Sequence, residues 1–271
     1  MATATIQPIL KFSCIGSIDR RVLLGKKLLV GPKKVPGIIG LKAFHLVSSE
    51  EVKSTPKVDS LYIDIGAKDK AAAEELIELG DVGVFDCDCL EFGSGMLKAK
   101  ALDDRVGCAV LLKLLERELP MDCTFAFTVQ EEVGMRGAFG AAFSVTPEIA
   151  LVVEGTTAAD IPAAEPLRQV CSLGKGPVIG LMDGGTIYDR ALFEQLRDLA
   201  EANNIPWQTK HYICGSTDGA AIQRTKAGVR VASLSAAVRY AHAPSSVACI
   251  RDLEALLDLA ARFIDDLAAK C

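Results

Sequence analysis

The chain has 271 residues, 50% of them hydrophobic and 24% charged, so it can bury a sizeable core and is not intrinsically disordered. Its formal net charge is −5, and no stripe of Lys and Arg extends beyond a few residues. This balance argues against nucleic acids and anionic membrane surfaces as partners and favours a small or peptide-like substrate.

Residues 9–98 consist mainly of short apolar runs interrupted by Gly and Pro, a pattern typical of a small β-rich domain. The runs occupy residues 9–12, 21–24, 27–30, 38–41 and 61–64. The segment 69–79 is an exception, because its apolar residues recur near helical spacing and Gly80 follows as a stop signal. This segment predicts one short helix.

From about residue 99 the pattern changes to longer helices that alternate with apolar strands, which indicates α/β organisation. Helices are predicted over 104–118, 189–203 and 250–267, and strands over 123–129, 149–153, 177–182, 207–213 and 229–234. The last helix is amphipathic and is expected to pack its apolar face on the sheet. The change of pattern predicts one domain over residues 1–98 and a second over residues 99–271.

Two adjacent carboxylates, Glu131 and Glu132, follow the predicted strand 123–129, at the edge where α/β sheets place their sites. In a hydrolytic metal site one carboxylate can bind the ion while its neighbour accepts a proton from the attacking water. We assign the first role to Glu132 and the second to Glu131. A Glu-Glu pair alone is a weak signal, because most such pairs are solvated strand ends.

Further acidic residues lie at the ends of other predicted elements. Asp103 and Asp104 stand at the start of the helix predicted over 104–118, where helix capping is the alternative explanation for one of the two. Glu154 directly follows the apolar run 149–153. A repeated acidic strand end is harder to explain as ordinary surface than a single one.

His242 lies beyond the predicted strand 229–234 and is one of only three histidines in the chain. Histidine is the commonest metal-binding side chain, although a single His is at least as often structural. Together with Asp103, Glu132 and Glu154 it provides hard oxygen ligands and one imidazole. Such a set suits zinc, cobalt or manganese rather than copper or an iron–sulfur cluster.

The cysteines and the start of the chain predict a cytoplasmic protein. Nine cysteines, an odd number, occur without the basic start and apolar centre of a signal sequence, so we expect reduced thiols. Cys87 and Cys89 have no second Cys/His pair at zinc-finger spacing, and packing is the simpler explanation for them. No apolar run reaches the roughly 18 residues of a membrane-spanning helix.

Five segments, in this order, resemble the tetrahedral (TET) metallo-aminopeptidases, a cytosolic family that includes glutamyl and deblocking aminopeptidases and proteins formerly labelled endoglucanases. The segments are Ala101–Cys108, Val129–Gly137, Val153–Thr156 with Ala159–Pro162, Ile213–Gly219 and Arg239–His242. Similar stretches upstream, at residues 12–21, 37–42 and 62–67, extend the resemblance over nearly the whole chain.

The resemblance implies a mixed-sheet, zinc-peptidase-like catalytic domain with helices on both faces and a small β-barrel-like dimerisation domain. Asp103 would bridge two metal ions, Glu132 and His242 would complete one site, Glu154 would bind the second ion, and Glu131 would be the general base. The resemblance also implies an aminopeptidase that removes the N-terminal residue of short peptides by hydrolysis. Zinc or cobalt would be the divalent ion, and dimers would assemble into a tetrahedral dodecamer.

One motif of the family is missing from this sequence. Family members begin with a helix and strands that end in a His-x-Asp motif, whose His binds the second ion, and the residues before Phe12 contain no such motif. The catalytic domain is therefore expected to be N-terminally incomplete. His45 and His211 lie elsewhere in the chain and are poor substitutes, because ligand geometry tolerates little displacement.

The expected function is a metallo-aminopeptidase impaired by the loss of one metal ligand. The site that contains Asp103 can hold one ion, whereas the site that needs Glu154 is weakened. The alternative is a non-catalytic or degenerate relative that keeps one metal for assembly or binding, and the retained Glu131 favours the enzyme. A glycan hydrolase, suggested only by the historical labels, would need two opposed carboxylates and no metal.

Overall fold

A computed structural model describes residues 2–5, 8–162 and 164–270. The chain divides into two compact units: the smaller comprises residues 1–88 with 242–245, and the larger comprises residues 89–241 with 246–271. In the described residues, no helix has the length and apolar composition needed to cross a membrane. The domain roles and the boundary inferred from the sequence stay predictions.

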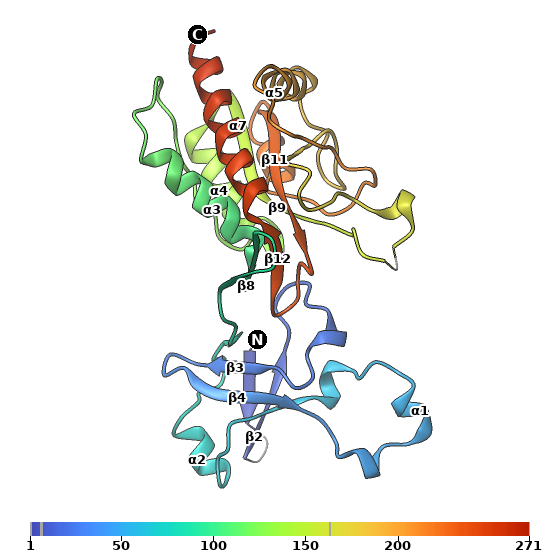
Figure 1. The fold of residues 1–271 in the computed structure, drawn as a ribbon. Helices are drawn as coiled ribbons and strands as arrows, with labels where there is room; N and C mark the ends of the chain where they lie inside the picture. Colours follow the sequence, from blue (N-terminus) through green and yellow to red (C-terminus); the bar gives the residue numbers. More distant parts are fainter. Residues whose placement is uncertain (1, 6–7, 163, 271) are drawn as a thin grey trace. The chain divides into compact units, whose positions relative to one another are not determined.

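The smaller unit contains an antiparallel sheet, six-stranded over the described residues (Figure 1). Its order is β1 (Ala2–Thr5), β2 (Ile9–Ser13), β5 (Tyr62–Asp64), β4 (Val35–Gly40), β3 (Lys27–Val30) and β6 (Gly83–Phe85). The short helical elements are η1 (Arg20–Val22), η2 (Phe44–Leu46), α1 (Ser49–Val52), η3 (Val58–Ser60) and α2 (Lys70–Glu74). Alternate strand residues, among them Leu10, Leu28, Ile39 and Ile63, form the buried core.

One of the apolar runs, residues 21–24, contributes no strand, because the side chain of Asp19 accepts a hydrogen bond from the Arg21 N–H and starts the helical turn η1. One sequence prediction in the smaller unit needs correction. The helix predicted over 69–79 ends at Glu74. Beyond Glu74 the chain is no longer helical, although Ile77 is buried in the core of the smaller unit; Leu79 is 84% exposed.

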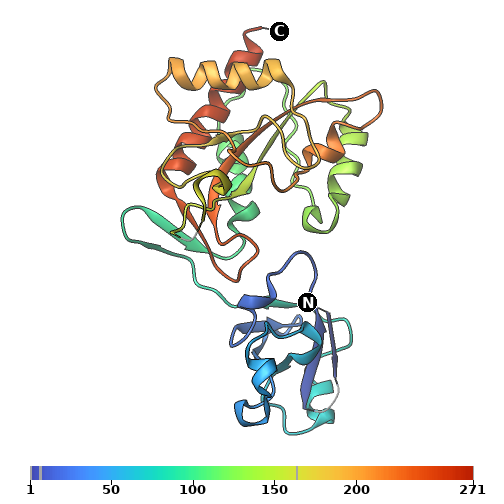
Figure 2. The same ribbon diagram turned by 90° about the vertical axis from the view of Figure 1, so that its right-hand side faces the viewer.

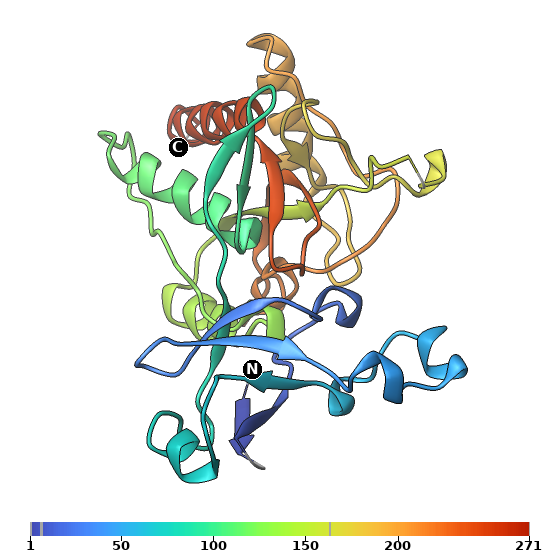
Figure 3. The ribbon, with the colours of Figure 1, turned by 60° about the horizontal axis from the view of Figure 1, so that its bottom comes forward.

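The larger unit contains a mixed sheet (Figure 3). Its order is β10 (Val178–Ile179), β11 (Arg230–Arg239), β12 (Ser246–Cys249), β8 (Met96–Ala99) and β7 (Leu90–Phe92), and β9 (Ile149–Thr157) pairs with the other edge of β11. The β9–β11 pairing is parallel, with Ile149 opposite Arg230 and Thr157 opposite Val238, whereas the other pairings are antiparallel.

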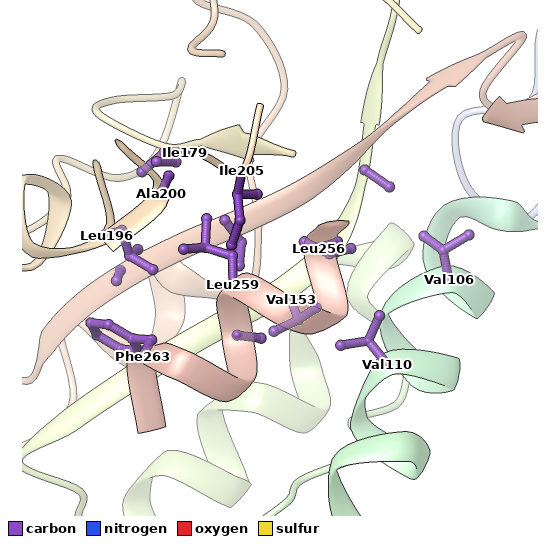
Figure 4. Packing of buried hydrophobic residues seen from close by; sticks show 14 of the residues in the cluster. Val106, Val110, Val153, Ile179, Leu196, Ala200, Ile205, Leu256, Leu259 and Phe263 are labelled. Carbon is purple, nitrogen blue, oxygen red and sulfur yellow. The ribbon is translucent and has the colours of Figure 1, made fainter. Parts of the chain in front are cut away.

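Helices pack on both faces of this sheet, which confirms the predicted α/β class (Figures 1 and 2). They are α3 (Leu102–Leu115), α4 (Arg136–Val145), α5 (Arg190–Ala202), α6 (Gly219–Ile222) and α7 (Ile250–Ala268), with the turns η4 (Glu131–Val133) and η5 (Pro166–Arg168). The main core joins α3, α5 and α7 to Val153 of β9 and to β11. Figure 4 shows Leu256, Leu259 and Phe263 of α7 pointing into this core. A smaller cluster on the other face joins Val152 to Ile222 of α6.

The predicted helices of the larger unit are present, but two predicted strands are not. Residues 123–129 and 207–213 form no strand in the structure, except for an isolated bridge between Gln208 and Val178. The run 123–129 is apolar enough for a strand, and 207–213 contains three large apolar or aromatic residues, but a strand also requires the backbone of a neighbour in register. The strand predicted over 177–182 is limited to the two residues of β10, and α4 was not predicted.

Candidate metal centre and active site

Asp103 and Asp104, the two acidic residues at the start of α3, lie in different environments. Asp103 has an extended backbone, and the peptide bond between Asp103 and Asp104 is cis. Gly155 of β9 permits the close approach of Asp103, because a Cβ atom at position 155 would lie 2.9 Å from the Asp103 Cβ atom. One carboxylate oxygen of Asp104 accepts a hydrogen bond of 2.9 Å from the Gly107 N–H. Asp104 therefore caps the helix, and Asp103 remains beside β9.

Asp104 lies among other carboxylates, which changes its ionisation. Its side chain is open to a cavity but surrounded by protein, and this desolvation raises the pKa of Asp104 to about 8. The Gly107 N–H opposes the rise by favouring the ionised form, whereas the negative charge of Asp103 adds to it. Without a cation, Asp104 therefore favours its protonated form at neutral pH.

Glu154 lies inside β9, one residue beyond the predicted strand 149–153, because β9 continues to Thr157. Its side chain is only 9% exposed. Burial, and then the negative charge of Asp103, hold the pKa of Glu154 well above its ordinary value, while the positive charge of Lys210 opposes the shift. A nearby cation is the chemistry that would let Glu154 ionise.

Glu131 and Glu132 lie in the turn η4, between Gln130 and Gly134. Gln130 and Gly134 both have left-handed backbone conformations, with φ values of 62° and 115°. Such a conformation favours Gly, so Gly134 fits the turn without strain. The turn exposes Glu132 more than Glu131.

His242 lies in the loop that joins β11 to β12. A ring nitrogen of His242 and one carboxylate oxygen each of Asp103 and Glu132 all lie within 4.8 Å of one another. In the described residues, Glu154 is outside this three-residue group, as are His45 and His211. The structure thus brings together three of the four predicted ligands and leaves Glu154 next to Asp103 as a neighbouring charge.

Two polar residues of this region had no predicted role. The Thr128 hydroxyl donates a hydrogen bond to one oxygen of Asp218, and the other oxygen is buried without a hydrogen-bond partner among the described residues. Burial raises the pKa of Asp218. Lys210 supplies the positive charge near Glu154. Asp218 lies in the segment Ile213–Gly219 that carries the family resemblance, and it stands at the start of a Gly-Ala helix; both were signals in the sequence that could have indicated it.

A cavity of about 760 Å³ in the larger unit is lined by the acidic residues described above, whereas His242 and Lys210 are not among its lining residues. Its acidic lining residues are Asp103, Asp104, Asp122, Glu131, Glu132, Glu148, Glu154 and Asp218. The rest of its wall is mainly apolar. Oxygen ligands, one imidazole and a local excess of negative charge fit a divalent ion such as zinc, cobalt or manganese.

Comparisons with known proteins agree with this arrangement. Residues 5–259 match the M42 glutamyl aminopeptidase family. An aminopeptidase from the archaeon Desulfurococcus kamchatkensis is 34% identical, with a TM-score of 0.92 over 98% of this chain and 75% of that chain. The TET aminopeptidase of a marine sediment thaumarchaeon is 31% identical, with a TM-score of 0.94 over 98% of this chain and 77% of that chain.

The lysyl aminopeptidase of Pyrococcus furiosus is 28% identical over 93% of this chain and 74% of its own length. These similarities confirm the resemblance to the TET aminopeptidases and the mixed α/β fold that it implied. The chain belongs to the M42 glutamyl aminopeptidase family, whose members are hydrolases.

Proposed function

We propose that this chain is a metal-dependent aminopeptidase that hydrolyses the N-terminal peptide bond of short peptides. The observation that carries the proposal is the group of Asp103, Glu132 and His242, whose ligand atoms lie within 4.8 Å of one another. These three side chains would hold one divalent ion, with zinc or cobalt as the first candidates.

The bound ion would polarise the scissile carbonyl and make water more acidic. Glu131 is the proposed general base: it accepts a proton from the attacking water and delivers that proton to the leaving amine. Asp103 and Glu154 would help to hold a second ion. The apolar part of the cavity would exclude bulk water from the reacting groups.

The second ion is expected to bind more weakly than the first. Glu154 favours its protonated form because it is buried beside Asp103, so an ion must displace a proton to bind there. No described histidine accompanies Glu154 in a ligand group. We therefore propose reduced aminopeptidase activity, and a non-catalytic relative that keeps one ion for assembly or binding is the alternative.

We also propose that the chain forms a homo-oligomer. One similar solved structure is described as a dodecamer, and a Pyrococcus horikoshii TET1 peptidase is described as assembling into a tetrahedron or a large octahedral shell. A tetrahedral dodecamer built from dimers is the corresponding form for this chain.

Eight cysteines are free in the described residues, which supports a cytoplasmic location.

Metal counting combined with hydrolysis assays tests this function. Protein loaded with zinc or cobalt would be analysed by inductively coupled plasma mass spectrometry, for the natural sequence and for His242→Ala and Glu154→Gln. We expect about one tightly held ion in the natural sequence, its loss in His242→Ala and its retention in Glu154→Gln. Hydrolysis of leucyl, glutamyl and lysyl p-nitroanilides, measured with and without a chelator, gives the activity.

The outcomes of these measurements distinguish the candidate functions. Chelator-sensitive hydrolysis supports the aminopeptidase, and one ion without any hydrolysis supports the non-catalytic relative. Two tightly held ions with full turnover would contradict the proposed weakness of the second site. Activity on glycans that survives the chelator would indicate a glycosidase, whose carboxylates need no metal.

A further inference from the structure

Thr128 connects the turn η4 to a loop that is distant in the sequence. Its hydroxyl donates a hydrogen bond to a carboxylate oxygen of Asp218, which lies 90 residues further along the chain. Thr128 stands shortly before Glu131, the first residue of η4, and Asp218 stands directly before α6. This hydrogen bond therefore ties the start of the turn to the start of a helix.

The turn η4 is flanked by strained backbone positions. Gln130 before it and Met135 after it have left-handed conformations, with φ values of 62° and 54°. Such conformations are unfavourable for residues other than Gly, and they persist where surrounding contacts fix the chain. Inside the turn, the N–H groups of Gly134 and Met135 both donate to the Glu131 carbonyl at 2.9 Å. The turn that carries Glu131 and Glu132 therefore depends on contacts with other segments.

A buried chain of hydrogen bonds holds the loop that contains Asp218. Asp183, Tyr188 and Thr217 are 5%, 5% and 2% exposed. The Tyr188 hydroxyl donates to Asp183 at 2.5 Å and lies 3.0 Å from the Thr217 hydroxyl. The Thr217 oxygen accepts a hydrogen bond of 3.0 Å from the Gly219 N–H. The chain thus reaches the residue that follows Asp218.

The carboxylate of Asp183 sets the direction of this chain. A carboxylate accepts hydrogen bonds, and besides the Tyr188 hydroxyl it accepts those of the Gly185 and Thr186 N–H groups, each at 2.8 Å. The Tyr188 oxygen, whose proton points to Asp183, therefore accepts from the Thr217 hydroxyl. All donors point the same way, so the hydrogen bonds strengthen one another.

The segment that begins at Asp183 also packs closely on the loop before α6. The Gly184 N–H donates to the Gly215 carbonyl at 2.8 Å, and a Cβ atom at Gly184 would lie 2.7 Å from that carbonyl oxygen. A Cβ atom at Gly185 would clash with the Ser216 side chain. The two glycines therefore allow this segment to form a close support for the loop.

We propose that Thr128 and Asp218 are positioning residues for the metal centre. The buried chain that ends at Asp183 holds Asp218 in place, Asp218 holds Thr128, and Thr128 fixes the backbone that enters η4. The turn then presents Glu132 to the ion. The inference rests on the proposed metal centre, of which Glu132 is one ligand. Groups that orient a metal ligand typically change ion affinity by about 10–100-fold when they are removed.

Loss of a single hydroxyl tests the positioning role. Thr128→Val keeps the shape of the side chain but cannot donate to Asp218, so we expect its affinity for zinc to fall by about 10–100-fold in competition with a chromophoric chelator. Thr128→Ser restores the hydroxyl and should restore the affinity. Thr124→Val makes the same chemical change at an exposed position of the same segment and should leave the affinity unchanged.

Hydrogen exchange in metal-free protein separates this inference from the proposed function. The N–H groups of Gly134 and Met135 should exchange faster in Thr128→Val than in the natural sequence, because the turn is held less firmly. Thr128→Ser and Thr124→Val should exchange like the natural sequence. A natural chain that binds no zinc would contradict the proposed function, and the exchange rates would still test the contact of Thr128.

Two results would overturn the inference while the proposed function stands. One is unchanged exchange in Thr128→Val, which would show that the turn does not depend on the hydroxyl. The other is faster exchange with unchanged zinc affinity, which would show that the turn does not position the metal centre.

A double-mutant cycle tests the buried chain. Tyr188→Phe removes the hydroxyl between Asp183 and Thr217, and we expect a smaller loss of zinc affinity than in Thr128→Val. Added to Thr128→Val, it should cause no further loss, because both changes act through the same connection. The same further loss in both backgrounds would contradict the chain. Circular dichroism checks that the variants are folded, and Thr217→Val takes the place of Tyr188→Phe in the cycle if that variant does not fold.

Discussion

Glu131 and Glu132 are adjacent in the sequence and share the turn η4, yet only Glu132 belongs to the group with Asp103 and His242. The turn therefore separates two side chains that have the same chemistry. One carboxylate can contribute to an ion site while its neighbour serves in proton transfer. This difference in position, and not a difference in residue type, is what makes the two assigned roles compatible.

Glu131→Gln tests the proton-transfer role. The amide cannot accept the proton, so kcat for aminoacyl p-nitroanilides is expected to fall by about 10²–10⁴-fold. The metal content should stay unchanged, because Glu131 is not a proposed ligand. Glu118→Gln is the control, since Glu118 is exposed and lies after α3. A variant that loses its metal together with its activity would contradict the assignment of Glu131 as base.

Asp160 gives a prediction about pH. Burial alone would raise the pKa of Asp160, but two hydrogen bonds from Arg239 and one from the Leu173 N–H outweigh it and leave the pKa below its ordinary value. The folded-state pKa is therefore lower than the unfolded value of about 3.9. The stabilisation is complete above that value and is lost as the pH falls through the folded-state pKa.

Asp160→Asn is expected to lower the free energy of unfolding of the larger unit by about 1–3 kcal/mol at pH 7, because a charged double hydrogen bond is lost. The difference from the natural sequence should shrink at pH 3. Urea unfolding at both pH values measures it. Asp258→Asn removes an exposed ion pair with Arg262 and should change the free energy by no more than about 0.5 kcal/mol. A difference independent of pH would contradict the charge argument.

The sequence could predict the acidic site residues because each lies near the end of an apolar run or at the start of a helix. That pattern is local, so Asp103, Glu132 and Glu154 were visible in it. Tertiary structure brings Lys210 near Glu154 and Asp218 near Asp104, although these residues are distant in the sequence. No spacing in the sequence encodes those contacts.

At the scale of elements, the amphipathic helices were easier to predict than the strands. The predictions for 189–203 and 250–267 agree with α5 and α7 to within a residue or so at each end, because helical periodicity reports on one segment alone. Residues 123–129 have the apolar composition of a strand, and 207–213 contain Trp, Tyr and Ile, but neither segment forms a ladder in the structure. Composition indicates which residues favour burial, but pairing depends on which backbone lies alongside.

Asp252, in the first turn of α7, binds the backbone of a neighbouring loop. Its two carboxylate oxygens accept hydrogen bonds of 2.7 Å and 2.9 Å from the N–H groups of Gly174 and Gly176, and the side chain is 3% exposed. Gly176 has a φ of +83°, and a Cβ atom there would lie 1.9 Å from the Pro206 carbonyl oxygen. The loop conformation therefore requires Gly at this position, and Asp252 satisfies its backbone.

Asp252→Ala is expected to destabilise the larger unit by about 2–4 kcal/mol, because two buried N–H groups lose their acceptor. Asp252→Asn keeps one acceptor oxygen and should cause a smaller loss. Urea unfolding gives the free energies, and hydrogen exchange at Gly174 and Gly176 locates the change. Glu254→Ala, on the exposed side of the same helix, is the control. Equal losses for the Ala variants at 252 and 254 would refute the loop-anchoring role.

At the scale of the whole molecule, each compact unit has its own hydrophobic core. The core of the smaller unit includes Leu10, and that of the larger unit includes Leu256; both side chains are 0% exposed. Each core is assembled from elements of its own unit, so each unit can bury its apolar surface by itself. Two separate cores favour two cooperative unfolding transitions over one.

Leu10→Ala and Leu256→Ala test this independence by calorimetry. Each variant is expected to lose about 2–5 kcal/mol from the unit that contains it, because a buried leucine leaves a cavity. Leu10→Ala should therefore lower the midpoint of one transition, and Leu256→Ala that of the other. Leu112→Ala, at a side chain that is 56% exposed, should move neither midpoint appreciably. A single transition that both core variants lower equally would show that the two units unfold together, because a shared transition requires that the loss of one core destabilises the other.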